Sequence, residues 1–275
     1  MSVRFWLLIL SCAIVSPSAL LGQADEREEI VTLTEQIRKE PTNSALYRRR
    51  GDMNRTVQNW DAAHSDYEQA STLDSKIDEI DFLKGRLFLE ANWPASAKVA
   101  LDRFLRQHNN HVEALITRAR ALAKLGLSAA SAGDYSRALQ LTPQPQPELY
   151  IERAQTVAAE GDAHLNDAVA GLDEGLKKLG PVVTLQLAAI DLELRQKRYD
   201  AALERIDAAA AATPRKESWL ARKGEILRLA GRGAEAREAY RAALQALESL
   251  PAARRNVPAT AALEKNIREQ YEKLK

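Results

Sequence analysis

The chain has 275 residues, of which 28% are charged and 5% are aromatic, and its formal net charge is +1. A charge so close to zero argues against a nucleic-acid binder and against a protein held on an anionic membrane surface by net charge. Many Leu and Ala residues, with few aromatic, Gly or Pro residues, are typical of long amphipathic helices rather than sheets. The length allows one large domain or an array of small repeated elements.

The first residues, 1–24, differ in composition from the rest of the chain. Arg4 is their only charged residue, most of the others are apolar, and Gly22 and Ala24 stand at the two small-residue places of a signal-peptidase site. We interpret residues 1–24 as a signal peptide, which predicts an exported protein, periplasmic or secreted. Its removal would make basic and acidic residues equal in number. It would also remove Cys12, the only cysteine, so the mature chain could form no disulfide and no thiolate metal site.

Two alternatives for this segment remain open. It could stay in place as an uncleaved membrane anchor, but Pro17 and several polar interruptions argue against a spanning helix. The sequence Leu10-Ser11-Cys12 loosely resembles the lipidation motif of bacterial lipoproteins, in which Cys12 would carry the lipid. That motif suits the chain poorly, because the apolar run before Cys12 is short and an apolar tail follows it.

Residues 25–41 are predicted to form an N-terminal helix. Ile30, Leu33 and Ile37 recur at helical spacing, and Pro41 stops the segment. An apolar stripe of this kind needs a neighbour to pack against. We therefore expect the helix to cover the first of the repeats that follow.

Residues 43–250 carry a pattern of small and large residues that returns about every 34 residues. In the first copy, small residues stand where a helix usually buries larger side chains, and large residues lie between them. The small residues of this copy are Gly51, Ala63 and Ala70, and the large ones are Tyr47, Trp60 and Tyr67. Similar spacing is clear in the third copy (Leu115, Ala119, Tyr135, Ala138) and in the sixth (Leu220, Gly224, Ala236, Tyr240, Ala243).

This spacing resembles the tetratricopeptide repeat, a helix–turn–helix element of about 34 residues. The resemblance implies an all-α fold, a right-handed α-solenoid of about six such elements with N- and C-terminal flanking helices. Small residues let the two helices of an element approach, and large residues fill the space beside them. Two copies fit less well: the second has Phe104 at a small-residue place, and the fourth requires a longer turn near residues 163–167.

Residues 251–275 are predicted to form a C-terminal capping helix after a basic loop that ends at Pro258. The apolar stripe of this helix, within residues 259–274, consists of Leu263, Ile267, Tyr271 and Leu274. The last element of a repeat stack exposes an apolar face unless a helix with a polar outer side covers it. We therefore expect a cap, and the alternative is a detachable helix that binds a partner.

No catalytic, cofactor-binding or metal-binding residue is predicted. His108 and His111 have a spacing that metal ligands can have, but they lie between two helices without a third ligand nearby in the sequence. We interpret them as part of a solvated linker. No Ser, Thr or Cys stands at a sequence spacing from a histidine that is typical of a catalytic nucleophile and its base. The sequence also contains no Gly-rich phosphate-binding loop. The sequence therefore predicts a protein that is not an enzyme, although a carboxylate pair assembled in space would leave no sequence signal.

The resemblance implies a binding surface, because the first helices of such arrays line a concave groove. Carried over residue by residue, the candidate groove consists of Arg48, Asp52, Arg55, Phe82, Arg86, Leu89, Ile116, Arg120, Ile151, Gln155, Leu187 and Leu194. The sixth copy places Ser218, Ala221, Glu225 and Arg228 at the corresponding positions. Arginine can hold a carboxylate with two hydrogen bonds, and apolar pockets anchor a peptide or a helix. The alternative is that the arginines pair with acids such as Asp52, Glu79 and Glu113 and only solvate the surface.

The sequence thus predicts a non-catalytic protein–protein interaction adaptor or scaffold that binds a peptide or helix, with no nucleic-acid partner and no cofactor. After signal removal it should not bind membrane surfaces strongly. The competing hypothesis is a lipid-anchored envelope assembly or structural protein that acts through its convex face or by self-association.

Some members of the family hold a partner's C-terminal carboxylate with basic and Asn residues. Arg48 matches that pattern, but Asp52 and Glu113 depart from it, so this mode is not predicted. The partner's identity and the oligomeric state do not follow from the sequence.

Overall fold

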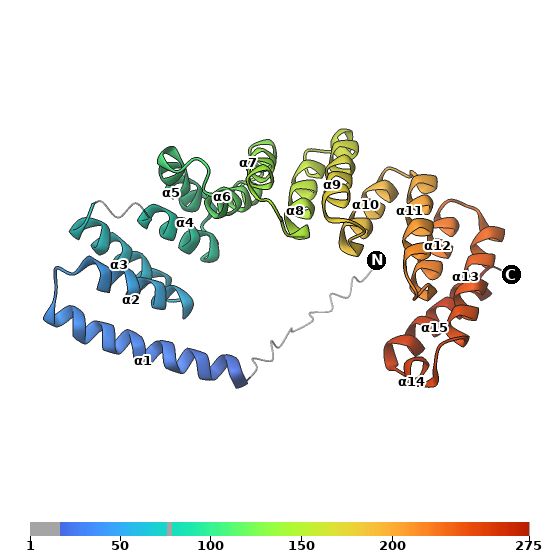
Figure 1. Ribbon diagram of the computed structural model, residues 1–275, viewed down its shortest axis with the longest axis horizontal. Coiled ribbons are helices and arrows are strands. Elements are labelled where there is room, and N and C mark those ends of the chain that lie inside the picture. The colour runs from blue at the N-terminus through green and yellow to red at the C-terminus, as the bar shows by residue number, and fades with distance from the viewer. Residues whose placement is uncertain (1–16, 76–78, 275) are drawn as a thin grey trace, which may run out of the picture. The chain divides into compact units, whose positions relative to one another are not determined.

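The computed structural model describes residues 17–75 and 79–274, with side chains from Asp25 onward. This described part consists of helices joined by turns and contains no strand (Figure 1). The chain forms two compact units, unit 1 (Met1–Asn109) and unit 2 (Asn110–Lys275). Unit 1 contains α1 (Pro17–Lys39), α2 (Ser44–Thr56), α3 (Trp60–Leu73), α4 (Ile80–Glu90) and α5 (Pro94–Gln107). Unit 2 contains α6 (Val112–Lys124), α7 (Ser128–Leu141), α8 (Pro147–Ala158), the 3-10 turn η1 (Asp162–His164), α9 (Leu165–Leu179), α10 (Val183–Arg195), α11 (Tyr199–Ala212), α12 (Glu217–Leu229), α13 (Gly233–Glu248), α14 (Ala252–Arg255) and α15 (Pro258–Glu272).

Helices that follow one another in the chain pack as pairs. In unit 1 the pairs are α2–α3 and α4–α5, and in unit 2 they are α6–α7, α8–α9, α10–α11 and α12–α13. Flanking helices complete the arrangement, since α1 packs on α2 and α15 packs on α13. The all-α fold expected from the sequence is thus present. We call α2, α4, α6, α8, α10 and α12 the first helices of their pairs.

Small residues of one helix contact large residues of the other in several pairs, as the repeat spacing predicted. A Cβ added at Gly51 would lie 2.8 Å from ring carbons of Tyr67, and one added at Gly224 would lie 2.6 Å from ring carbons of Tyr240. Ala138 is fully buried. The aromatic ring of one helix therefore occupies the space that a larger residue on the other helix would need.

The turn inside each pair contains one residue with a positive φ. Gly126 (φ 72°) and Gly231 (φ 76°) adopt this left-handed conformation without a Cβ penalty. The same conformation is adopted by Gln58 (φ 60°), Asn92 (φ 61°) and Lys197 (φ 57°), for which it is less favourable. The turn geometry is therefore retained even where the sequence lacks the glycine that would signal it.

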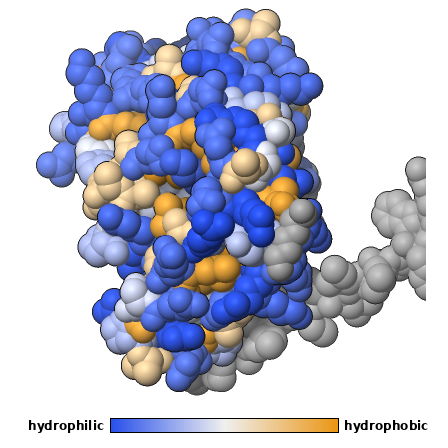
Figure 2. All heavy atoms as spheres, turned by 90° about the vertical axis from the view of Figure 1, so that its right-hand side faces the viewer, coloured by the Kyte–Doolittle hydropathy of each residue, from blue (hydrophilic) through white to orange (hydrophobic). Residues whose placement is uncertain are grey.

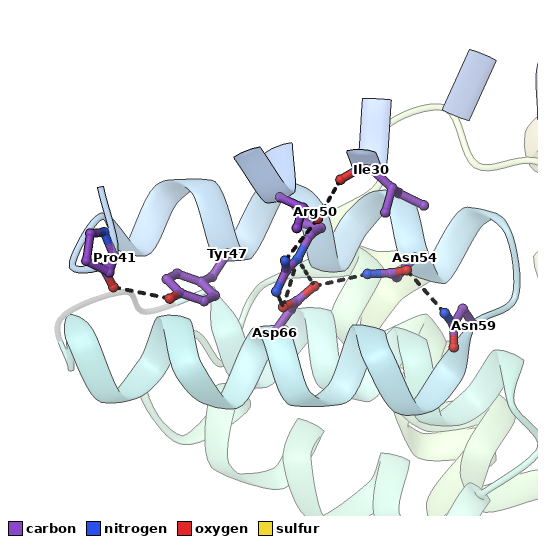
Figure 3. A network of polar contacts seen from close by, with 8 residues as sticks. Ile30, Pro41, Tyr47, Arg50, Asn54, Asn59 and Asp66 are labelled. Atoms are coloured by element: carbon purple, nitrogen blue, oxygen red, sulfur yellow. Dashed lines mark hydrogen bonds and ion pairs between the residues drawn. The ribbon is translucent and has the colours of Figure 1, made fainter. Parts of the chain in front are cut away.

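A polar network ties the first pair to α1 (Figure 3). Arg50 Nη2 donates to Asp66 Oδ1 at 2.6 Å, and Arg50 Nε donates to Asp66 Oδ2 at 3.0 Å. Arg50 Nη1 also donates to the Thr34 hydroxyl of α1 at 3.1 Å, and Asn54 donates to Asp66 at 3.0 Å. Because Asp66 is buried, these charge-assisted bonds offset the cost of removing its carboxylate from water.

The C-terminal helix covers the last pair. Ile267 of α15 is fully buried, and Leu263, Tyr271 and Leu274 pack beside it on the core formed by α10 to α13. Figure 2 shows the side of the molecule on which Figure 1 places α13 to α15, and this face is mostly hydrophilic with scattered hydrophobic residues. The apolar stripe thus faces the core of unit 2, as expected for a cap.

Three local features differ from, or add detail to, the sequence-based expectations. The longer turn expected in the fourth copy contains η1, and the predicted loop before Pro258 contains the one-turn helix α14. Helix α1 begins at Pro17, so the predicted cleavage point after Ala24 falls inside it. Cys12 and the rest of residues 1–16 lie outside the described residues. Within the described part, no helix is both long and apolar enough to span a membrane.

Candidate peptide-binding surface on the first helices

In unit 1, the groove residue Arg55 is engaged by the protein's own carboxylate. Arg55 Nη1 lies 2.7 Å from both carboxylate oxygens of Glu90, which belongs to the next first helix. The Tyr67 hydroxyl of α3 donates to Asp52 at 2.7 Å. Burial raises the pKa of Tyr67 well above its usual value, and the hydrogen bond to Asp52 adds to this effect. Arg55 is 18% exposed, so little of its guanidinium is available to a ligand.

Three other groove residues of unit 1 also contact the protein itself. Arg48 lies 3.9 Å from Asp52, a loose ion pair with the arginine 41% exposed. The guanidinium of Arg86 lies over the ring of Phe82, 5.7 Å from its centre. Phe82 is only 7% exposed and packs against Phe104. It therefore lies in the core, and we leave it out of the proposed binding surface.

In unit 2, Arg120 is held in a second network of this kind. Its Nε and Nη2 donate to Glu152 of the next first helix at 2.9 and 2.8 Å, and the Tyr135 hydroxyl donates to Glu152 at 2.6 Å. The hydrogen bond to Glu152 raises the pKa of Arg120. Burial alone would raise the pKa of Glu152, but hydrogen bonds from Arg120 and Tyr135 outweigh it, and the pKa lies below the usual value.

The apolar candidates of unit 2 differ in how much surface they offer. Ile116 and Ile151 are partly buried against the core formed by α6 to α10. Leu194 is partly buried against the core of the following pairs. Leu187 is 40% exposed, and Gln155 is exposed. Gln155 and Leu187 are therefore the exposed members of this set, and the isoleucines are partly covered.

The first helix of the sixth pair lines a pocket together with α13 and α15. The pocket has a volume of about 320 Å³. From α12 it is lined by Ser218, Ala221, Arg222, Glu225 and Arg228, from α13 by Tyr240, and from α15 by Leu263, Asn266 and Gln270. The spacing of the repeats predicted four of the α12 residues. The contribution of α15 was missed, although Asn266 and Gln270 stand at helical i, i+4 spacing outside the apolar stripe.

The two arginines of this pocket have different partners. Arg222 donates to Glu225 at 2.6 Å and to Asp191 at 2.9 Å. Arg228 lies near the hydroxyl of Tyr240, whose pKa is raised by burial and partly lowered again by this arginine. Within the described residues, Arg228 makes no ion pair with a carboxylate. The pocket therefore holds one cation that is neutralised by its neighbours and one that is not.

The histidines considered as metal ligands have local roles. His111 accepts a hydrogen bond from the Ala114 amide at 3.1 Å and so caps α6. His108 stacks on Phe104 with ring centres 4.5 Å apart. Among the described residues there is no group of three or more His, Cys, Asp or Glu side chains placed to hold a metal.

Similarity to known proteins agrees with the repeat pattern. A family model described as a tetratricopeptide repeat-like domain matches residues 158–257, and one described as a tetratricopeptide repeat matches residues 82–144. A tetratricopeptide repeat protein from Parabacteroides merdae ATCC 43184 has a similar solved structure, with a TM-score of 0.55 and 17% identity over 91% of this chain and 95% of that chain. No curated protein matches the sequence.

Two further solved structures are similar. YrrB, described as a TPR protein with an unusual peptide-binding site, has a TM-score of 0.54 and 19% identity over 66% of this chain and 92% of its own. PilW, described as a type IV pilus biogenesis factor, has a TM-score of 0.54 and 20% identity over 70% of this chain and 88% of its own. At these identities the similarity shows the fold, an all-α helical repeat as the residue spacing predicted.

Proposed function

Because the chain belongs to the tetratricopeptide repeat family, we propose that it is a non-catalytic adaptor that binds a peptide or helix of a partner protein on its first helices. The repeat is generally a non-enzymatic interaction module. The observation that carries the proposal is that repeat spacing selected two exposed side chains on first helices, Gln155 and Leu187. The same spacing selected four of the nine residues that line the pocket on α12. YrrB is described as having a peptide-binding site, which illustrates that a similar fold can carry one.

The proposed surface is tested by panning a display library of random peptides on the purified protein. Gln155→Arg on α8 and Leu187→Arg on α10 should reduce binding of the selected peptides, because both residues are exposed on first helices. Gln140→Arg is the matched control, since Gln140 is exposed on the second helix α7. Failure to select any peptide, or equal loss with all three variants, would count against the proposal.

We also propose that the protein acts in an exported compartment, a bacterial periplasm. The support is the composition of residues 1–24 and their small-residue cleavage site. Intact-mass measurement of the protein purified from its own cells is the test. A mass that begins near Asp25 supports export with cleavage, a lipid on Cys12 supports the anchored envelope protein, and a mass that includes an unmodified Met1 contradicts both.

A further inference from the structure

Three pairs place a tyrosine of the second helix against an arginine of the first helix. They are Tyr67 with Arg55, Tyr135 with Arg120, and Tyr240 with Arg228. In the first two cases the next first helix supplies a carboxylate, Glu90 or Glu152, that holds the arginine at hydrogen-bond distance. These arginines are thus neutralised inside their own units before any ligand arrives.

The third case lacks such a carboxylate. The helix that follows the sixth pair in the packing is α15, and the residues that it turns toward the pocket are Leu263, Asn266 and Gln270. Glu225, the acid nearest in sequence on α12, lies 2.6 Å from Arg222 instead. The positive charge of Arg228 therefore remains without a carboxylate within the described part of the chain, and the pocket favours a negatively charged occupant.

The remaining lining groups suit the main chain of a peptide. Asn266 and Gln270 are one helical turn apart and face the same pocket. Each amide offers a donor and an acceptor, as a peptide bond does. Neither side chain makes a hydrogen bond within the described residues. Leu263, Ala221 and the Tyr240 ring add apolar surface beside them.

The lining of the pocket extends along most of α12. Its lining runs from Ser218 in the first turn of α12 to Arg228 near the end of that helix. Ten residues of helix span about 15 Å, which is the length of about four or five residues of extended chain. The shape therefore suits a segment that passes along the helix better than a compact small molecule.

We propose that this pocket binds an extended peptide segment of a partner and holds one acidic side chain of that segment on Arg228. The proposal rests on the proposed function and deepens it, since it names the end of the array and the class of residue that is recognised. Asn266 and Gln270 hold the main chain of the segment, and Leu263 with Tyr240 packs against a neighbouring apolar side chain.

The test uses peptides selected from a random display library by the wild-type protein, with affinities measured by fluorescence anisotropy. Selected sequences should contain an Asp or Glu at a fixed place, and its change to the amide should weaken binding about tenfold or more, the value of a charge-assisted hydrogen bond. Arg228→Gln should produce the same loss and remove the difference between acid and amide peptides. The matched control is Arg268→Gln on the same helix as Asn266, because Arg268 pairs with Glu264 and does not line the pocket.

Other outcomes would overturn the inference in distinguishable ways. Peptides that bind equally to wild type and Arg228→Gln, but are lost with Gln155→Arg and Leu187→Arg, would leave the proposed function standing and remove this pocket from it. Peptides whose affinity depends only on a free C-terminal carboxylate, and is lost when that terminus is amidated, would contradict recognition of an acidic side chain. If no peptide is selected by the wild type, the proposed function and this inference fail together.

Discussion

The first and sixth helix pairs carry the same three side chains at the same spacing but use them differently. An acid and an arginine stand three residues apart on the first helix, and a tyrosine follows twelve residues after the arginine; the residues are Asp52, Arg55 and Tyr67, and Glu225, Arg228 and Tyr240. In the first pair Glu90 closes on the arginine, whereas in the sixth pair α15 turns amides and a leucine toward it. The next helix, not the repeat itself, therefore decides whether a groove arginine is neutralised by a carboxylate of the protein.

Both pairs contain a close contact between a glycine of the first helix and the tyrosine of the second. Disrupting this contact should cause the largest loss of stability. Gly224→Ala should lower the free energy of unfolding by about 1–3 kcal/mol, because the new Cβ would lie 2.6 Å from the Tyr240 ring and the ring must move. Chemical denaturation of wild type and variant measures this difference.

Gly133→Ala is the control for that change. Gly133 lies inside α7, and a Cβ there would meet nothing within 4 Å, so the variant should gain about 0.5–1 kcal/mol from helix propensity. Equal effects of the two substitutions would mean that the tight contact of Gly224 with Tyr240 does not exist in solution.

The next largest loss of stability is expected from removing Glu152, the carboxylate that binds both Arg120 and Tyr135. Glu152→Ala should cost about 1–2 kcal/mol, because the buried Tyr135 hydroxyl loses its acceptor and Arg120 loses its counter-ion. The exposed Glu160, in the turn after α8, should change stability by less than about 0.5 kcal/mol when replaced by alanine. Equal stabilities of the two variants in urea denaturation would show that the network contributes nothing.

The reciprocal change gives the sixth pair the carboxylate that its arginine, Arg228, lacks. Asn266→Glu places a carboxylate in the lining of the pocket that contains Arg228, where it competes with an acidic ligand for the arginine. It should weaken binding of acidic peptides about tenfold. Asn256→Glu makes the same chemical change at an exposed site outside the pocket and should leave affinity unchanged. Fluorescence anisotropy titrations measure the affinity of both variants for an acidic peptide. An unchanged affinity of Asn266→Glu would show that its new carboxylate does not compete for Arg228.

These pairs also show what the sequence could and could not predict. Contacts inside one pair were predictable, because Gly51 and Tyr67, or Gly224 and Tyr240, lie in one copy and recur at one spacing. The sequence-based alternative named acids that pair with the groove arginines, and one of them, Asp52, lies loosely beside Arg48. The partners of the more tightly held arginines were not foreseen.

The sequence did not predict these partners because they lie in the next helix pair. Glu90 is 35 residues after Arg55, and Glu152 is 32 residues after Arg120, so their contacts depend on how pairs stack rather than on any local period. The role of α15 was hidden for a similar reason. Its apolar stripe predicted the packed face, but which polar residues border the pocket depends on the angle at which the helix packs on α13.

The smallest expected effect is a pH dependence of the free energy of unfolding, which distinguishes the hydrogen-bonded Glu152 from the exposed Glu160. The folded-state pKa of Glu152 lies below its usual value, so its carboxylate stabilises the fold above about pH 5, and this contribution is lost as the pH falls through the folded pKa. The loss of stability caused by Glu152→Gln should therefore be largest near neutral pH and should shrink below about pH 4. Glu160→Gln, at an exposed site in the turn after α8, is the matched control. Denaturation at a series of pH values measures both variants, and a Glu152→Gln effect that stays constant down to acid pH would mean that the ionised carboxylate does not hold Arg120 in solution.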